Sequence, residues 1–410
     1  MLLKSIQLTN FMSFGSATQA LALLPLNVVI GPNGSGKSNL LEAINLLREI
    51  PRDLHDPIRK GGGIREWLHK GPTGVATTQA SIEVTIPVRT VPGDWLEYFF
   101  MPITAPANAK TGATDLTYKI TLAALGAKPD IVSESLLEHD TQGAGVVPCT
   151  HLHVSNGQAQ VASAGTLQQL SGFEFDASQS LLSQRKDPRQ YWAMTYTASA
   201  FSNIRLYREW SFGRDSRLRQ PQPADAPNEH LAPDASNLGL VLNRLRREPA
   251  VKKRLLEALQ VLYEGINDFD VQIDGGTVQV FFHEGPNPIP ATRLSDGTLR
   301  YLCLLAILCH PNPGPLVCIE EPELGLHPDV LPTLATLLKE ASERTQIIVT
   351  THSDVLVDAL TDSPECILVA GRSDHGTLIE RLDAEQLAPW LENYRLGQLW
   401  IRGQIGGTRW

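Results

Sequence analysis

The stretch VVIGPNGSGKSNLLEAINLL, residues 28–47, runs from β-branched apolar residues through a glycine-rich segment into a helical pattern. Its central part, GPNGSGKS at 31–38, has the spacing G-x-x-x-x-G-K-S. With a strand before it and a helix after it, this pattern predicts a loop that binds phosphate groups through backbone N–H groups and a helix N-terminus. The alternative, a glycine-rich turn with a surface lysine, fits this context poorly.

The phosphate loop also indicates its ligands. Gly31, Gly34 and Gly36 allow the backbone to wrap closely around a β-phosphate. We expect Lys37 to bridge the β- and γ-phosphates and Ser38 to coordinate Mg²⁺. The expected cofactors are therefore ATP and Mg²⁺, and the residues expected to bind the nucleotide are Asn33, Gly34, Ser35, Gly36, Lys37, Ser38 and Asn39.

A second segment, PLVCIEEPE at 315–323, reads as a buried strand that ends in two carboxylates. A carboxylate at such a strand end can hold a magnesium ion through water, and its neighbour can orient the attacking water. We assign the metal-side role to Glu320 and the water-side, catalytic role to Glu321. The alternative is a solvated acidic loop that follows a core strand.

The segment IIVTTHSD, 347–354, places His352 just past the next buried strand. From this position an imidazole could reach the γ-phosphate, so we predict a catalytic role for His352. A single histidine after a strand is more often a capping or packing residue, and that is the alternative.

The segment LSDGTLRYLCLLAIL, 294–308, opens with polar residues and then becomes an apolar helical pattern. Ser295 or Asp296 is a natural N-cap, and Gly297 permits the close approach of an anion to the helix N-terminus. One nucleotide needs only one such anion-binding helix start. The second therefore predicts a homodimer in which this segment binds the γ-phosphate of an ATP held by another subunit.

Charge and composition limit the function classes. Apolar residues make up 42% and charged residues 19%, as in a globular protein, and the net charge of −9 argues against a surface that is basic all over. Basic residues concentrate at 205–219 and 244–254. They indicate either a solvated face with ion pairs or a surface that docks DNA or an acidic partner.

The chain contains five cysteines without CxxC spacing, which favours a reduced, cytoplasmic location. We expect no secretion signal, because the first residues lack a basic-then-apolar pattern. We also expect no membrane segment, since the run YLCLLAILC at 301–309 is about half as long as a bilayer span. No stretch sustains the apolar heptads of a long coiled coil.

The phosphate loop, LSDGT, the strand ending in EEPE, and TTHS together resemble the ATP-binding-cassette heads of the SMC and RecF class. The lead-in LTNFMSF, the segment IEEPELGLHP at 319–328 and the segment GQLWIRGQIGG at 397–407 resemble more closely the stand-alone ATPases of the AAA_21 family, many of which occur in prokaryotic genome defence and DNA maintenance. This resemblance is specific over about residues 1–50 and 290–360 and looser elsewhere.

The resemblance implies an α/β P-loop ATPase head with a mixed central sheet, an antiparallel β subdomain and a helical lobe. We expect residues 1–130 to form the N-terminal part of the core, 131–290 a helical lobe, and 291–410 the C-terminal part. The resemblance also implies a dimer with ATP held between the two subunits, in which Ser295 and Gly297 of each subunit contact the nucleotide of the other. It further implies a glutamine near the magnesium ion. We choose Gln184 for that role, while Gln190 stays open. LSDGT in place of LSGGQ, and glutamate in place of aspartate on the metal side, depart from the commonest pattern.

The motifs favour an ATPase that acts on DNA or controls a separate nuclease or toxin effector. An ATP-bound scaffold with negligible turnover is the alternative. The ATPase subunit of a membrane transporter is disfavoured by the long separation of the phosphate loop from LSDGT. A head with its own C-terminal nuclease domain is disfavoured because few residues follow Ser353.

Overall fold

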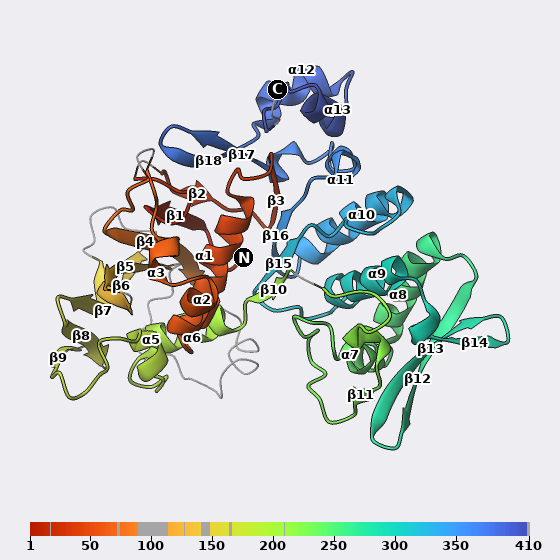
Figure 1. The fold of residues 1–410 in the computed structure, drawn as a ribbon, viewed down its shortest axis with the longest axis horizontal. Coiled ribbons are helices and arrows are strands. Elements are labelled where there is room, and N and C mark those ends of the chain that lie inside the picture. Colours follow the sequence, from red (N-terminus) through yellow and green to blue (C-terminus); the bar gives the residue numbers. More distant parts are fainter. Residues whose placement is uncertain are drawn as a thin grey trace. The chain divides into compact units, whose positions relative to one another are not determined.

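The computed structural model describes residues 1–410 except 17, 72–73, 89–113, 127, 141–147, 164–165, 209 and 408–410. The chain forms two compact units (Figure 1). The first unit comprises residues 1–24, 33–204 and 370–380, and the second comprises residues 25–32, 205–369 and 381–410. These boundaries differ from the three consecutive regions that we expected, because segments distant in sequence complete each unit.

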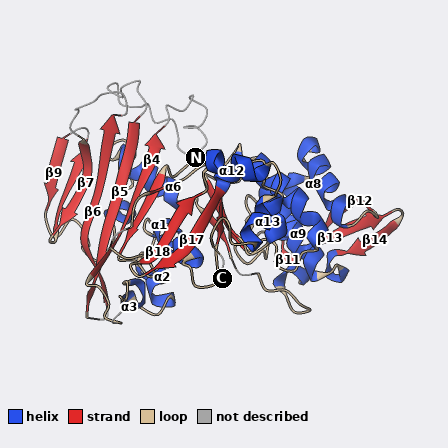
Figure 2. Ribbon diagram, turned by 90° about the horizontal axis from the view of Figure 1, so that it is seen from above, coloured by secondary structure: helices blue, strands red, loops and turns tan. Residues whose placement is uncertain are grey.

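The first unit is built on an eight-stranded antiparallel sheet in the order β2-β1-β4-β5-β6-β7-β8-β9, and Figure 2 shows its strands side by side. Alternate residues of β4 are buried, so one face of the sheet packs on the core. The strands are β1 (Ser5–Thr9), β2 (Leu21–Ala22), β4 (Gln79–Val88), β5 (Thr114–Leu125), β6 (Lys128–Asp140), β7 (Cys149–Ser155), β8 (Gln158–Ser163) and β9 (Thr166–Leu170).

Among the described residues, five helices accompany this sheet. The long amphipathic helix α1 packs against α2 and α6, and α6 also contacts α5 and β7. Seven of the thirteen residues of α1 are buried, so this helix is part of the core of the unit. The helices are α1 (Lys37–Glu49), α2 (His55–Lys60), α3 (Ile64–Trp67), α5 (Leu181–Gln184) and α6 (Trp192–Ser202).

A six-stranded sheet has the order β10-β15-β16-β3-β17-β18. Neighbours among the first five strands pair in parallel, and every residue of β3 and β16 is buried, as expected for a sheet covered on both faces. The strands are β3 (Leu26–Ile30), β10 (Arg205–Tyr207), β15 (Leu316–Glu320), β16 (Gln346–Thr350), β17 (Ile367–Ser373) and β18 (Gly376–Arg381). Residues 370–380, from β17 and β18, belong to the first unit.

The helices of the second unit share one apolar core. Helix α10 packs against β3 and β16, while α9 contacts α7, α8 and α10. The helices are α7 (Leu238–Leu245), α8 (Pro249–Leu262), α9 (Asp296–Leu308), α10 (Leu331–Ser342), α11 (Asp354–Asp358), α12 (Ala384–Leu391) and α13 (Leu396–Ile401), with short 3-10 turns η1 (Arg217–Arg219), η2 (Ala291–Arg293), η3 (Pro328–Val330) and η4 (Pro364–Cys366).

A small antiparallel sheet in this unit packs on α7 and α8. Its strands are β11 (Gln222–Pro223), β12 (Ile266–Asp274), β13 (Thr277–Glu284) and β14 (Asn287–Pro290). Strands β12 and β13 form a hairpin, and Gly275 and Gly276 both take positive φ in its turn.

After residue 294 helices and strands alternate in the order α9, β15, α10, β16, α11 and β17. The beginning of the expected helical lobe differs, because residues 128–170 continue the antiparallel sheet as β6–β9. Among the described residues no helix is longer than the 14 residues of α8, which agrees with the absence of a long coiled coil. No described helix is long and apolar enough to cross a membrane.

Candidate functional site

The phosphate loop leads into the first turn of α1. Gly34 and Gly36 have φ of 78° and 102°, in the left-handed region that glycine adopts without strain. Gly36 is the N-cap of α1, no side chain caps the helix there, and its first turn carries no acidic residue. The positive end of the helix is thus not neutralised from within this turn, which suits the binding of a phosphate group.

The loop is buttressed by residues from two other segments of the first unit. Thr377 on β18 donates from Oγ1 to the carbonyl of Ser35 at 2.9 Å and lies 2.7 Å from Ser13 Oγ. Ser13 Oγ also accepts a hydrogen bond of 2.7 Å from the Asn39 amide. A Cβ on Gly36 would collide with the Thr377 side chain and with Ser13 Oγ. Sequence reasoning missed Thr377, which no motif marks, whereas Ser13 belongs to the LTNFMSF lead-in.

The loop residues present fit a nucleotide phosphate. Ser35 Oγ is buried and, among the described residues, has no hydrogen-bond partner, although a buried hydroxyl normally has one. Lys37 is only 6% exposed, and the cost of burying its ammonium is met when anionic groups surround it. The Ser38 hydroxyl is an oxygen donor of the kind that Mg²⁺ takes.

In the second unit, β15 ends at Glu320 and the chain turns at Glu321. Glu320 accepts a 2.8 Å hydrogen bond from Arg208, which follows β10. Glu321 has φ of 46°, a left-handed conformation that non-glycine residues rarely adopt. Its N–H donates to the carbonyl of Thr350 at 2.9 Å. The left-handed conformation thus ends the extended backbone of β15 at Glu321.

The expected catalytic residues Glu321 and His352 lie next to each other. His352 Nε2 is 3.5 Å from a carboxylate oxygen of Glu321, and both side chains are about one-third exposed, at 35% and 31%. Glu323 joins the segment after β15 to the segment after β16. Its Oε1 accepts hydrogen bonds of 2.7 Å from Thr351 Oγ1 and from the His352 N–H. Sequence reasoning missed Glu323, although it is the third carboxylate of the EEPE segment.

The expected second anion site begins α9. Ser295 is the N-cap, and its Oγ accepts from the Thr298 N–H at 3.1 Å. Asp296 pairs with Arg219 at 2.6 Å, and the pKa of its carboxyl is lowered chiefly by that hydrogen bond. A Cβ on Gly297 would lie 2.6 Å from the carbonyl oxygen of Gly325, so internal packing already requires glycine there.

Gln184, expected near the magnesium ion, lies at the end of α5 in the first unit. Its Oε1 accepts from the Asp176 N–H at 2.7 Å, and its Nε2 donates to the carbonyls of Asp176 and Gln179, both at 3.0 Å. The amide therefore stabilises the turn at 176–180. This is the ordinary role of a glutamine at a helix end, and the magnesium role stays a prediction.

The basic segments of the middle of the chain are largely ion-paired. Arg217 pairs with Asp234, Arg246 with Asp270 and Arg254 with Glu340, in addition to the pairs of Arg208 and Arg219. The ion-pair interpretation of these segments is thus confirmed for those arginines. Trp210 and Phe212, which interleave with the arginines, pack against the core of the second unit.

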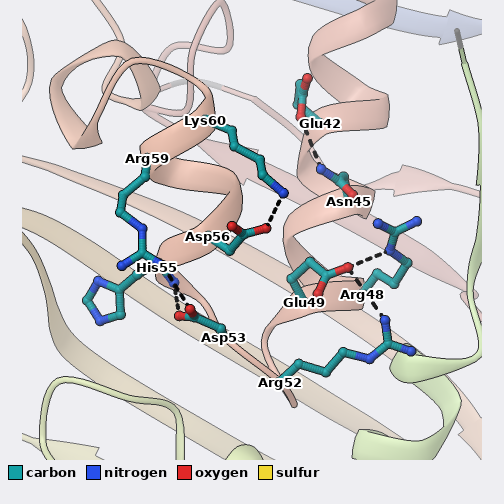
Figure 3. A network of polar contacts seen from close by, with 10 residues as sticks. All are labelled: Glu42, Asn45, Arg48, Glu49, Arg52, Asp53, His55, Asp56, Arg59 and Lys60. Carbon is teal, nitrogen blue, oxygen red and sulfur yellow. Dashed lines mark hydrogen bonds and ion pairs between the residues drawn. The ribbon is translucent and has the colours of Figure 1, made fainter.

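A similar arrangement occurs at the end of α1 and along α2, where Figure 3 shows the basic side chains pointing toward neighbouring carboxylates. Arg48 lies 2.8 Å from Glu49, and Lys60 lies 2.7 Å from Asp56. The Lys60–Asp56 pair is exposed, and such a pair contributes little to stability, on the order of 0–1 kcal/mol, whereas the Arg48–Glu49 pair is partly buried. They neutralise the cationic groups that an anionic polymer would otherwise meet.

The fold is that of SMC ATPase heads. The structure of an SmcHead bound to the C-winged helix domain of ScpA matches with a TM-score of 0.55 and 14% identity, over 95% of this chain and 100% of that one. An Smc head domain with an extended coiled coil from Pyrococcus furiosus, bound to the C-terminal domain of ScpA, matches with a TM-score of 0.55 and 13% identity, over 95% of this chain and 98% of that one. The expected fold class is thereby confirmed.

The family follows from sequence. Residues 26–91 and 198–358, more than half of the 410, match the AAA_21 family, described as "AAA domain, putative AbiEii toxin, Type IV TA system". The chain belongs to this family. It is also 58% identical over 43 residues to the chromosome partition protein Smc of Synechococcus, a match that spans 10% of this chain and 4% of that protein.

Proposed function

We propose that the chain binds ATP with Mg²⁺ and hydrolyses it. The observation that carries this proposal is the pairing of Glu321 with His352 beyond the ends of β15 and β16. In this proposal Lys37 binds the β- and γ-phosphates, and Ser38 and Glu320 hold the metal ion, which neutralises phosphate charge when bound. Glu321 orients the attacking water and accepts its proton, and His352 contacts the γ-phosphate.

We further propose that ATP joins two copies of the chain, each binding the nucleotide of the other with Ser295 and Gly297. The exposure of Ser295 at the N-terminus of a thirteen-residue helix supports this proposal, because an exposed helix N-terminus can bind an anion from a second molecule. Family membership supports it as well, since the sandwich is what the resemblance implies.

The test uses Glu321→Gln, which keeps the size of the side chain but cannot accept the proton. We expect this variant to bind ATP, to release phosphate slowly and to accumulate as a dimer in light scattering with ATP. Lys37→Ala serves as the control that neither binds nor dimerises. A Glu321→Gln protein that stays monomeric with saturating ATP would contradict the sandwich, and one with full phosphate release would contradict the catalytic assignment.

One observation favours a second candidate function, an ATP-bound scaffold with negligible turnover. Arg208 forms a 2.8 Å ion pair with Glu320, the carboxylate that we assign to the metal ion. A guanidinium there competes with a cation for Glu320. Steady-state phosphate release by the wild type, compared with Lys37→Ala, separates the two candidates, since a scaffold releases no more phosphate than the control.

We place the protein in the cytoplasm and propose that it controls a separate effector or a DNA-linked process. The family description, which names a toxin and a toxin–antitoxin system, supports an effector. The match to a chromosome partition protein supports a link to DNA. Because the described arginines of the basic segments are largely paired with carboxylates, we favour a protein effector as the direct partner. Co-purification with and without ATP tests this choice.

A further inference from the structure

Three potential metal ligands gather on β6 and β7, outside the site described above. Glu138 on β6 lies directly opposite Cys149 on β7 in the antiparallel register, and directly opposite residues point to the same face of a sheet. His151 follows two residues after Cys149, so it also faces that side of the strand. The carboxylate, thiol and imidazole therefore meet on one face of the eight-stranded sheet.

A local irregularity brings the imidazole into this group. The register shifts between the pairs Leu137–Thr150 and Leu136–Leu152, which leaves His151 as the extra residue on β7. Such bulges re-aim a side chain and recur next to functional sites. The ring of His151 packs edge-on against Trp192 of α6, at 5.1 Å between centroids and 80° between planes, which fixes its orientation.

The distances suit a shared ion. His151 Nε2 lies 2.7 Å from Glu138 Oε2, and one donor atom from each of the three residues lies within 4.8 Å of the other two. Tetrahedral coordination with bonds of about 2.0–2.3 Å separates neighbouring donor atoms by roughly 3.3–3.7 Å. Shifts of about 1 Å in side-chain position are therefore enough to form the site.

We propose that Glu138, Cys149 and His151 bind one zinc ion. The donor set of one thiolate, one imidazole and one carboxylate is that of Zn²⁺, whereas Mg²⁺ and Ca²⁺ take oxygen donors only. Coordination replaces the Glu138–His151 hydrogen bond and releases the thiol proton to solvent. Three protein ligands leave the fourth position for water. The ion cross-links β6 to β7 beside α6.

The different exposure of the cysteines allows a metal bound to Cys149 to be detected by spectroscopy. Cys149 is exposed, whereas Cys303, Cys309, Cys318 and Cys366 are buried. A thiolate-to-metal signal at the surface therefore reports Cys149. In the protein stripped of metal, and without nucleotide, we expect Co²⁺ to bind at one ion per chain with a near-ultraviolet charge-transfer band and strong visible bands of tetrahedral cobalt. Added Zn²⁺ bleaches these bands, and Mg²⁺ does not.

Three variants test the assignment. Cys149→Ser removes the charge-transfer band. Glu138→Gln raises the dissociation constant for Co²⁺ by at least the roughly 10–100-fold that loss of a supporting residue costs. His153→Ala, an exposed histidine on the same strand, leaves binding unchanged. A wild-type protein without the band, or a Cys149→Ser protein that keeps it, overturns the proposal. Because no nucleotide is present, neither result depends on the proposed ATPase function.

Discussion

Arg300 donates a 2.9 Å hydrogen bond from Nη2 to the carbonyl oxygen of Glu321. Arg300 lies on α9, the helix whose N-cap is Ser295, whereas Glu321 follows β15 in a left-handed conformation. The guanidinium is held over the rings of Trp210 and Phe212, at 5.4 and 5.5 Å from their centroids. The helix with the proposed trans-acting N-terminus thus contacts the backbone of the proposed catalytic glutamate in the same chain.

We predict that Arg300→Met lowers kcat for ATP while KM changes little. Methionine can keep the contact with the aromatic rings but leaves the Glu321 carbonyl with the Leu324 N–H, at 3.2 Å, as its remaining donor, so the backbone that carries the carboxylate is held less firmly. A misplacement of about 1 Å can cost on the order of 100-fold in rate, and we expect a fall of about 10- to 100-fold. Loss of this part-buried hydrogen bond also lowers the free energy of unfolding by about 0.5–1.5 kcal/mol.

Phosphate release at varied ATP, together with urea unfolding, checks this prediction. Arg293→Ala is the matched control, because Arg293 is exposed and lies three residues before the start of α9. An unchanged kcat in Arg300→Met would show that the contact does not position Glu321. A change confined to KM would instead place Arg300 in nucleotide binding.

A second prediction concerns the two inner glycines of the phosphate loop. Gly34 and Gly36 both have positive φ, so alanine at either position is strained by about 1–2 kcal/mol. At Gly34 a Cβ meets nothing within 4 Å, whereas at Gly36 it collides with Thr377 and Ser13. We therefore expect Gly36→Ala to lose ATP binding and Gly34→Ala to weaken it only moderately.

Isothermal titration with a non-hydrolysable ATP analogue measures both affinities. The double variant Gly36→Ala, Thr377→Ser removes one of the colliding atoms, the Thr377 methyl carbon, and should recover part of the binding. Equal losses in the two single alanine variants would mean that backbone strain, and not the contact with β18, limits the loop.

The motifs and long periodic segments could be predicted from the sequence because each is local. The strand before the phosphate loop, α9 with Ser295 as its N-cap, and the strands ending at Glu320 and Thr350 all lie where the patterns indicated. The contact between Thr377 and Ser35 could not, since 342 positions separate the two residues and no spacing rule connects them.

Strands β6–β9 were missed for a different reason. Only one face of the sheet packs on the core there, and polar residues occupy even buried positions, as Glu134 shows with 1% exposure. A strand with glutamate on its buried face lacks the apolar alternation on which strand prediction depends. Its burial is compensated by three donors that are distant in sequence from it: Tyr118, Ser180 and the Leu181 N–H.

Glu134 leads to a third prediction, on pH dependence. Burial raises the pKa of this carboxyl, while the hydrogen bond from Ser180 opposes the rise. Because the folded pKa lies above that of the unfolded chain, the folded state binds more protons between the two values. Its stability therefore falls as pH rises through that window. We expect Glu134→Gln, which cannot ionise, to remove this contribution at a constant cost of about 1–3 kcal/mol for an imperfect partner.

Urea unfolding of both proteins from pH 4 upward, in steps of about one pH unit from near the ordinary pKa of glutamate, measures the difference. The wild type should lose stability relative to Glu134→Gln as pH rises. Tyr118→Phe, which keeps the carboxylate but removes one donor that stabilises its charge, should raise the folded pKa further, so that the loss continues to higher pH and is larger in total. A wild-type curve that runs parallel to that of Glu134→Gln would mean that folding does not change the pKa of this carboxyl.

The last prediction tests whether Ser295 acts on the nucleotide of a second copy. Lys37→Ala disables the phosphate loop but keeps α9 intact, whereas Ser295→Arg keeps the loop and blocks the helix N-terminus with a bulky cation. Each variant alone should be inactive. In an equimolar mixture only a mixed dimer has an intact composite site, and it has one such site out of two, so up to about half of wild-type activity should return. If Ser295 served only the nucleotide of its own chain, Ser295→Arg would be inactive and mixing would restore nothing, although each variant remained folded by circular dichroism. Full activity of Ser295→Arg by itself would remove the N-terminus of α9 from the mechanism altogether.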